Sequence, residues 1–164
     1  MKILFLATAI VLGVGFTACK PQNKSNSQPQ LADSSVNQIK NDMKNLISII
    51  EIPTSDFSRA VAFYQAILDI NIEEIEMDEV KMGLFPNSGA GISIQLIHGN
   101  DYKTSADGTI IYLNGGDDLQ KVADKIEANG GKIVVPKTEI GPEMGFFAMF
   151  IDPEGNKLGL HSFN

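Results

Sequence analysis

The chain has 164 residues, with 13 basic and 20 acidic side chains and a formal net charge of −7. An acidic chain without a basic stripe and interleaved aromatic residues argues against nucleic acid as a partner and against charge-driven binding to anionic lipid. Its single cysteine, Cys19, excludes a disulfide within the chain.

The first 18 residues are typical of an export signal. Lys2 gives a positive start, residues 3–16 form an almost unbroken apolar run, and the small pair Thr17-Ala18 precedes Cys19. The run is too short for a membrane span, which needs about 20 apolar residues. We expect cleavage before Cys19. Lys2 is the one charged residue removed, so 12 basic and 20 acidic residues would remain, with a net charge of −8.

Cys19 stands where the bacterial lipoprotein box, which ends in Ala-Cys, carries its lipid. Phe16 departs from the box, which more often has Leu at that place. The resemblance implies a lipoprotein of the bacterial cell envelope, anchored in a membrane through acyl chains on Cys19 and facing the periplasm. Each buried methylene of those chains contributes about 0.8 kcal/mol. The alternative is an ordinary secreted protein with a free thiol.

Residues 19–45 are predicted to be the lipidated cysteine and a flexible tether. From Lys20 the composition changes to Lys, Gln, Asn, Ser and Pro with few bulky apolar residues. Such a segment cannot bury enough surface to offset the entropy lost on ordering it. The remaining residues, 46–164, have the length of one small domain.

A weak internal repeat predicts two similar modules within this domain. Asp56 and Asp118 each follow an apolar, β-rich run and open a helical pattern, and aspartate is a good N-cap. Each helix then carries an apolar stripe at three- and four-residue spacing. The stripes are Phe57, Ala60, Val61, Tyr64 and Leu68 in the first helix and Leu119, Val122, Ala123 and Ile126 in the second.

Three strands are predicted after each helix, separated by turns rich in Gly, Pro, Asn and Asp. They cover residues 70–77, 80–85 and 92–97 in the first half and 132–135, 146–151 and 157–162 in the second. One strand precedes each helix, and the one before the second helix covers residues 109–114. The order is therefore βαβββ twice, which predicts an α+β domain.

Two segments resemble the vicinal oxygen chelate superfamily, which contains glyoxalase I, the bleomycin resistance proteins and the extradiol dioxygenases. They are residues 55–68, SDFSRAVAFYQAIL, and residues 147–162, FAMFIDPEGNKLGLHS. The resemblance covers essentially all of residues 46–163. It implies that the two βαβββ modules lie side by side and that their sheets form an incomplete barrel around a concave site.

Strand alternation predicts which side chains face this concavity, because the residues that contact the helices must point the other way. The helix-facing residues are predicted to be Ile50, Ile52, Ile94, Leu96, Ile111, Leu113, Leu158 and Leu160. Ile97 is predicted to face the concavity. The polar residues expected there, and expected to bind a small-molecule ligand, are Glu51, Ser93, Gln95, Tyr112, Asn114 and His161.

The resemblance places the superfamily's metal ligands at Ile49, Gln95, Ile110 and Gly159. Three of these residues have no donor atom, whereas a catalytic zinc takes three protein donors. We therefore expect no metal and no cofactor. The alternative is a relocated metal site built from Glu51 and His161, although facing residues of this kind more often form a hydrogen-bonded charged pair. The other histidine, His98, is predicted to lie at a loop edge in solvent.

Two functions follow from these observations, and whether the protein is an enzyme stays open. The first is metal-independent binding or sequestration of a small molecule by an envelope-anchored domain, as in the bleomycin resistance relatives. The second is a glyoxalase-type lyase or isomerase, with Glu51 as base and His161 as acid or as ligand to an off-pattern metal. A third role, as an assembly partner, follows from the dimers that relatives form, so a homodimer is among the expected partners.

Overall fold

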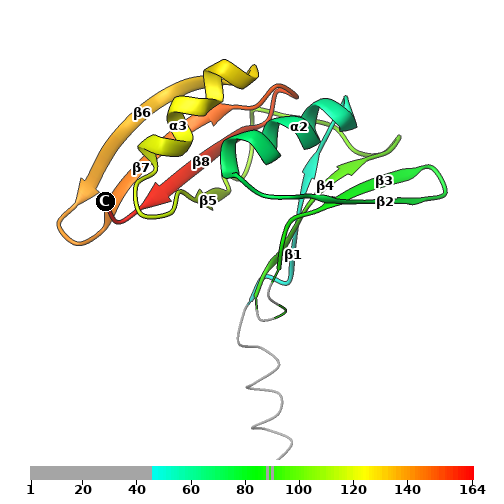
Figure 1. The fold of residues 1–164 in the computed structure, drawn as a ribbon, viewed down its shortest axis with the longest axis horizontal. Coiled ribbons are helices and arrows are strands. Elements are labelled where there is room, and N and C mark those ends of the chain that lie inside the picture. Colours follow the sequence, from blue (N-terminus) through cyan, green and yellow to red (C-terminus); the bar gives the residue numbers. More distant parts are fainter. Residues whose placement is uncertain (1–45, 88, 90) are drawn as a thin grey trace, which may run out of the picture. The chain divides into compact units, whose positions relative to one another are not determined.

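The computed structural model describes residues 46–87, 89 and 91–164 (Figure 1). The predicted signal peptide, Cys19 and the predicted tether lie outside the described residues. All described residues belong to one unit, Asp42–Asn164. No helix in the described ranges is both long and apolar enough to cross a membrane.

Two four-stranded mixed sheets make up this unit (Figure 1). The first has the order β1-β4-β3-β2 and consists of β1 (Ile49–Pro53), β2 (Glu73–Met77), β3 (Val80–Leu84) and β4 (Ser93–His98). The second has the order β5-β8-β7-β6 and consists of β5 (Tyr112–Asn114), β6 (Lys132–Gly141), β7 (Gly145–Ile151) and β8 (Lys157–Ser162). β1 runs parallel to β4 and β5 parallel to β8, while the other neighbours are antiparallel.

One helical connection follows the first strand of each module. Helix α2 (Phe57–Leu68) joins β1 to β2, and helix α3 (Gln120–Ile126), extended by the 3₁₀ helix η1 (Glu127–Asn129), joins β5 to β6. The sheets do not close on each other through a shared strand pair. The predicted α+β fold of two βαβββ modules in an incomplete barrel is confirmed.

The predicted cap of α2 is present, whereas the N-cap position of α3 is Leu119, which makes no side-chain cap bond, and Asp118 lies one residue before it. Asp56 Oδ1 accepts a hydrogen bond from the Arg59 N–H at 3.0 Å, and Asp118 Oδ1 accepts one from the Gln120 N–H at 3.0 Å. Each bond satisfies one of the N–H groups that a helix start leaves without a partner. In α2 the buried stripe is wider than predicted, because it also includes Phe63 and Ile67.

The core lies between the helices and the two sheets. It contains all eight residues predicted to face the helices, five of them fully buried and three partly buried: Ile52, Leu96, Leu113, Leu158 and Leu160, then Ile50, Ile94 and Ile111. Ile97, predicted to face the concavity, is 2% exposed but lies outside this core. Its side chain is therefore buried rather than open to a ligand.

Three strand boundaries differ from the prediction by more than one residue. β2 begins at Glu73 rather than at residue 70, β5 begins at Tyr112 rather than at residue 109, and β6 continues to Gly141 rather than ending at residue 135. Pro136 has no N–H to donate, which is why the pattern predicted an end there. β6 is an edge strand and pairs with β7 through three register shifts, so it tolerates the proline.

The turn between β7 and β8, residues 152–156, connects the two modules. Asp152 Oδ1 accepts hydrogen bonds from the N–H groups of Glu154 at 2.9 Å and Asn156 at 2.8 Å, which closes the turn. Its Oδ2 accepts one from the Tyr64 hydroxyl of α2 at 2.8 Å. Asn156 Nδ2 donates to the Pro53 carbonyl at the end of β1, at 2.8 Å. The sequence predicted a turn here but not these partners.

Glu154 brings a second buried carboxylate to the same place, with its side chain 0% exposed. Oε2 accepts from the Ser55 N–H at 2.8 Å, from the Ser55 hydroxyl at 2.6 Å and from the Asp56 N–H at 2.7 Å. Oε1 accepts from Arg59 Nε at 2.7 Å. These donors lie at the start of α2, where the helix dipole favours negative charge. A residue of the second module thus caps the helix of the first.

The two carboxylates have opposite pKa shifts. Burial alone raises the pKa of Glu154, but the hydrogen bonds from Arg59 and Ser55 outweigh it and lower the pKa from 4.5 to about 2. For Asp152 burial prevails over the hydrogen bonds and raises the pKa above its ordinary value. Burial, followed by the charge of Asp152, raises the pKa of the Tyr64 hydroxyl well above its ordinary value.

We expect Glu154→Gln to lower the free energy of unfolding at pH 7 by about 3 kcal/mol, the equivalent of this pKa shift. The pKa of Glu154 is lower in the folded state, so its contribution is present above pH 4.5 and is lost as the pH falls toward 2. The gap between wild type and variant should therefore close over that range in denaturant titrations. The exposed Glu143→Gln serves as control, and a gap that is absent at pH 7 or independent of pH would contradict the role of Glu154.

Candidate functional site

A hollow of about 560 Å³ lies where β5 and β8 end. We call it the β5–β8 hollow, and its volume is within the range of about 300–1,000 Å³ that is common for small-molecule sites. It includes three of the predicted site residues. Its lining consists of Tyr112, Leu113, Asn114, Gly116, Asp117, His161, Ser162 and Phe163.

The predicted residues of the second sheet are neighbours because of the strand register. Asn114 pairs with His161 across β5 and β8. Asn114 Oδ1 accepts from the Gly116 N–H at 2.9 Å. His161 Nε2 lies 2.9 Å from the Met144 carbonyl oxygen, which can only accept, so this nitrogen carries a proton. In the neutral ring Nδ1 is then the acceptor.

The ring of Tyr112 packs directly on Gly159, its register partner in β8. A Cβ added at Gly159 would overlap the ring, with even Cγ of Tyr112 at 2.8 Å. The ring is also edge-to-face with Phe147 of β7, at 6.4 Å between centroids and 67° between planes. A longer side chain at position 159 therefore requires Tyr112 to move.

The residues at the superfamily's four ligand positions do not fit a resident metal ion. Ile49 is a hydrocarbon side chain, 56% exposed, and Ile110 is also aliphatic. Gln95 donates through Nε2 to Glu51 Oε1 at 2.8 Å, and Gly159 has the Tyr112 ring over it. Within the described part of the chain, no group of three or more His, Cys, Asp or Glu is placed to hold a metal ion.

The other three predicted site residues form a separate group on the first sheet. Glu51 and Gln95 are register partners on β1 and β4, and Ser93 Oγ accepts from Asn87 Nδ2 at 3.1 Å. None of the three lines the β5–β8 hollow. Glu51 binds Gln95 while His161 binds the Met144 carbonyl, so the hydrogen bonds of the described residues do not join Glu51 to His161.

Several residues of this region were not predicted as site residues, and three of them have side chains that bear on ligand binding. Asp117 and Phe163 line the hollow, and Phe147 packs against Tyr112. Strand alternation places Phe147 on the face of His161, its register partner, so that signal was present in the sequence. His98 was predicted to lie in solvent, but it is half-buried at the end of β4. Its Nδ1 is hydrogen-bonded to the Thr54 carbonyl at 2.9 Å.

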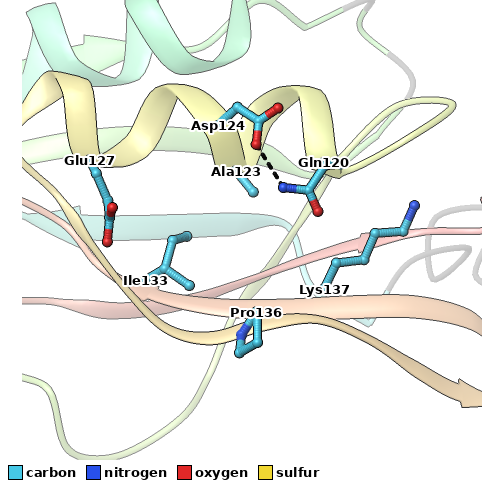
Figure 2. A pocket seen from close by; sticks show the side chains of 7 residues that line it. All are labelled: Gln120, Ala123, Asp124, Glu127, Ile133, Pro136 and Lys137. Carbon is cyan, nitrogen blue, oxygen red and sulfur yellow. Dashed lines mark hydrogen bonds between the residues drawn. The ribbon is translucent and has the colours of Figure 1, made fainter.

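A second hollow, of about 480 Å³, lies between α3 and β6 (Figure 2). Gln120 Nε2 donates to Asp124 Oδ1 at 2.7 Å across its rim (Figure 2). Lys137 Nζ binds Asp118 Oδ1 at 2.7 Å, and this bond lowers the pKa of Asp118. Three of its polar side chains, Gln120, Asp124 and Lys137, are thus already hydrogen-bonded, and it contains none of the predicted site residues. The β5–β8 hollow is therefore the better candidate site.

A family profile described as Glyoxalase/Bleomycin resistance protein/Dioxygenase superfamily matches residues 46–160. The chain belongs to that superfamily. A "Glyoxylase-like domain-containing protein" of Didymella fabae is 31% identical over 120 residues, which cover 67% of this chain and 88% of that protein.

Solved structures of the glyoxalase superfamily share the fold at low sequence identity. The fosfomycin resistance protein FosX of Listeria monocytogenes is 21% identical with a TM-score of 0.53, over 71% of this chain and 91% of that chain. A glyoxalase/bleomycin resistance protein/dioxygenase family enzyme of Burkholderia phytofirmans PsJN is 17% identical with a TM-score of 0.55, over 71% and 98%. Glyoxalase I of Zea mays is 16% identical with a TM-score of 0.54, over 70% of this chain and 45% of that chain, so this chain spans less than half of it.

We expect Gly159→Glu to destabilise the domain by about 1–3 kcal/mol, because the new side chain overlaps Tyr112. Tyr112→Ala removes the overlap, so Gly159→Glu should cost less in that background, with a coupling of about 1–2 kcal/mol. Urea unfolding of the two single variants and the double variant measures this coupling. Ser58→Glu, on the exposed face of α2, should add independently to Tyr112→Ala. Additive effects of the 159 and 112 substitutions would show that the ring does not fill this space.

Proposed function

We propose that this glyoxalase-superfamily domain binds or sequesters a small molecule without a resident metal ion, at the bacterial cell envelope. The observation that carries the proposal is the Tyr112 ring on Gly159. In metal-using relatives this position holds a ligand, whereas here it has no side chain and an aromatic ring covers it. Ile49 and Ile110 offer no donor atom at two further positions.

The β5–β8 hollow supplies groups suited to binding. Tyr112 presents an aromatic ring that is 44% exposed. Asn114 uses its Oδ1 for the Gly116 N–H, which leaves its Nδ2 as a donor toward a ligand. His161 has its Nε2 fixed on the Met144 carbonyl, so in the neutral ring its Nδ1 is the acceptor. A few fixed polar groups around an aromatic surface are the usual composition of a small-molecule site.

A glyoxalase-type lyase or isomerase reaction is the second function considered. It would require Glu51 and His161 to act on one substrate. Glu51 is held by Gln95 on the first sheet, and His161 is held by the Met144 carbonyl on the second. Binding alone needs no such convergence, which is why we favour it.

The Listeria relative is described as a fosfomycin resistance protein, and protection against a harmful small molecule is compatible with a binding role in the envelope.

The location in our proposal rests on sequence alone. Lys2, the apolar run over residues 3–16 and the sequence Thr17-Ala18-Cys19 support export and lipidation. An acidic chain is repelled by anionic headgroups, so the acyl chains on Cys19 would provide the membrane affinity.

We expect the purified protein to contain no stoichiometric zinc, nickel, iron or manganese, and its melting temperature to stay unchanged when these ions are added. A ligand that binds only the folded state must raise stability, so an unchanged melting temperature reports the lack of a site. Elemental analysis and thermal melting provide the measurements. A tightly held metal that disappears in Glu51→Ala and His161→Ala, but not in the control His98→Ala, would contradict metal-independent binding.

We expect Cys19→Ser to remove the protein from the detergent-soluble membrane fraction, or to leave it unprocessed, without changing the melting temperature of the domain. The reason is that lipid on Cys19 would be the anchor, while the core residues lie downstream. Membrane fractionation and mass spectrometry of the N-terminus test this. Wild-type protein that fractionates as soluble and reacts with a thiol reagent at Cys19 would show that the lipoprotein hypothesis is wrong.

A further inference from the structure

We infer that the β5–β8 hollow takes a flat cationic ligand: an aromatic or heteroaromatic ring that carries a protonated amine or another fixed positive charge. This rests on the proposed function, because it names the ligand class of the same site. Three properties of the lining support it, namely its exposed aromatic rings, a carboxylate that forms no ion pair among the described residues, and its lack of a lysine or arginine.

The aromatic surface is exposed but held in place. Tyr112 is 44% exposed while its ring rests on Gly159 and against Phe147. Phe163 is 73% exposed and lies edge-to-face with His161, at 5.2 Å between centroids and 82° between planes. Rings that are already packed lose little side-chain entropy when a ligand stacks on them. Such faces attract both flat rings and cations.

Asp117 brings to the hollow a carboxylate that forms no ion pair with the other described residues. The adjacent Asp118, by contrast, is paired with Lys137. Besides Tyr112, the other titratable side chain of the lining is His161, which is fixed through Nε2 to a carbonyl oxygen. A cation in the hollow would therefore find an available carboxylate, and an anion would find no lysine or arginine.

The surroundings of Phe163 strengthen this preference. Phe163 also borders a smaller hollow of about 320 Å³, in which the titratable residues are Glu139 and Glu143. Acidic side chains therefore belong to the linings of both hollows that Phe163 borders. With a net charge of −7 on the chain, the field at the site favours a positive ligand over a negative one.

The test compares two probes that share a ring and differ in charge, 1-naphthylmethylammonium and 1-naphthylacetate. Both are titrated into the full-length protein in nonionic detergent with EDTA present, and binding is followed by NMR. We expect the ammonium probe to bind about tenfold more tightly than the acetate probe, the size of a partly desolvated cation–π and charge contribution. Raising the salt concentration should reduce this ratio, because the charge term is screened.

Two variants assign the effect to residues. Asp117→Asn should lower the ratio about fivefold, since it removes charge alone, and Tyr112→Leu should weaken both probes. The exposed Asp101→Asn is the matched control and should leave the ratio unchanged. Melting curves show whether each variant is folded, and Asp117→Asn carries the test if Tyr112→Leu is not.

Four outcomes would overturn the proposed ligand class. They are equal binding of the two probes, a preference for the acetate, no binding of either probe, and a ratio unaffected by Asp117→Asn. Metal-independent binding would still stand in the first two cases. Binding of either probe that appears only when EDTA is replaced by a divalent metal would instead contradict the proposed function, so the two failures are distinguishable.

Discussion

Two buried carboxylates in one turn hold the modules of this domain together. Asp152 and Glu154 reach from the second module to α2 of the first, where Tyr64 and Arg59 bind them. Burying a charge is costly unless hydrogen bonds satisfy it, and removing one partner of a buried pair typically costs about 3–5 kcal/mol. In the described part of the chain no buried side-chain nitrogen or oxygen lacks a partner. The turn therefore specifies one arrangement of the modules.

The candidate site depends on this turn through β8. Asn156 ends the turn and binds the Pro53 carbonyl at the end of β1, while its Oδ1 accepts from the Ser105 N–H at 3.1 Å. β8 begins at the next residue, Lys157. The hydrogen bonds of Asn156 hold the start of β8 in place, and this position sets the register of β8 beside β5. That register sets Gly159 opposite Tyr112. The glycine leaves room for the ring, and the ring then takes the space in which metal-using relatives place a ligand.

Ile49, Ile110 and Gly159 stand at positions where metal-using relatives have ligands. Their presence affects the charge of the site as well as its ability to coordinate an ion. A bound divalent ion is often the largest local charge in a site and offsets nearby carboxylates. Here Asp117 stands in the lining with neither a metal position nor a lysine or arginine beside it. The same substitutions that argue against a metal ion thus leave a negative field over exposed aromatic rings. The proposed metal independence and the proposed preference for cations therefore share one structural origin.

The sequence predicted those features that depend on local pattern. Alternation identified all eight helix-facing residues, and residue type identified Asp56 as a cap. Features that join distant residues were not predicted. The Asp-Pro-Glu-Gly-Asn turn indicates a reversal, but the contact of Glu154 with Arg59 spans 95 positions in the sequence.

Two other differences have identifiable causes. Pro136 usually ends a strand, but the bulged edge strand β6 accommodates it. The six predicted site residues were assigned to one concave face but divide between two sheets, because face assignment gives the direction of a side chain and not its distance from another. The position of the Tyr112 ring depends on its rotamer and on the register with Gly159, and neither is visible in the pattern.

Anomalous diffraction at the zinc edge, from crystals of this protein grown with zinc, tests most directly whether the site is built on an aromatic ring rather than on a metal. The account predicts the Tyr112 ring in density over Gly159 and no anomalous peak bound to Glu51, Gln95 or His161. A strong peak at about 2.0–2.2 Å from a nitrogen of His161 and an oxygen of Glu51, with the Tyr112 ring displaced, would contradict it.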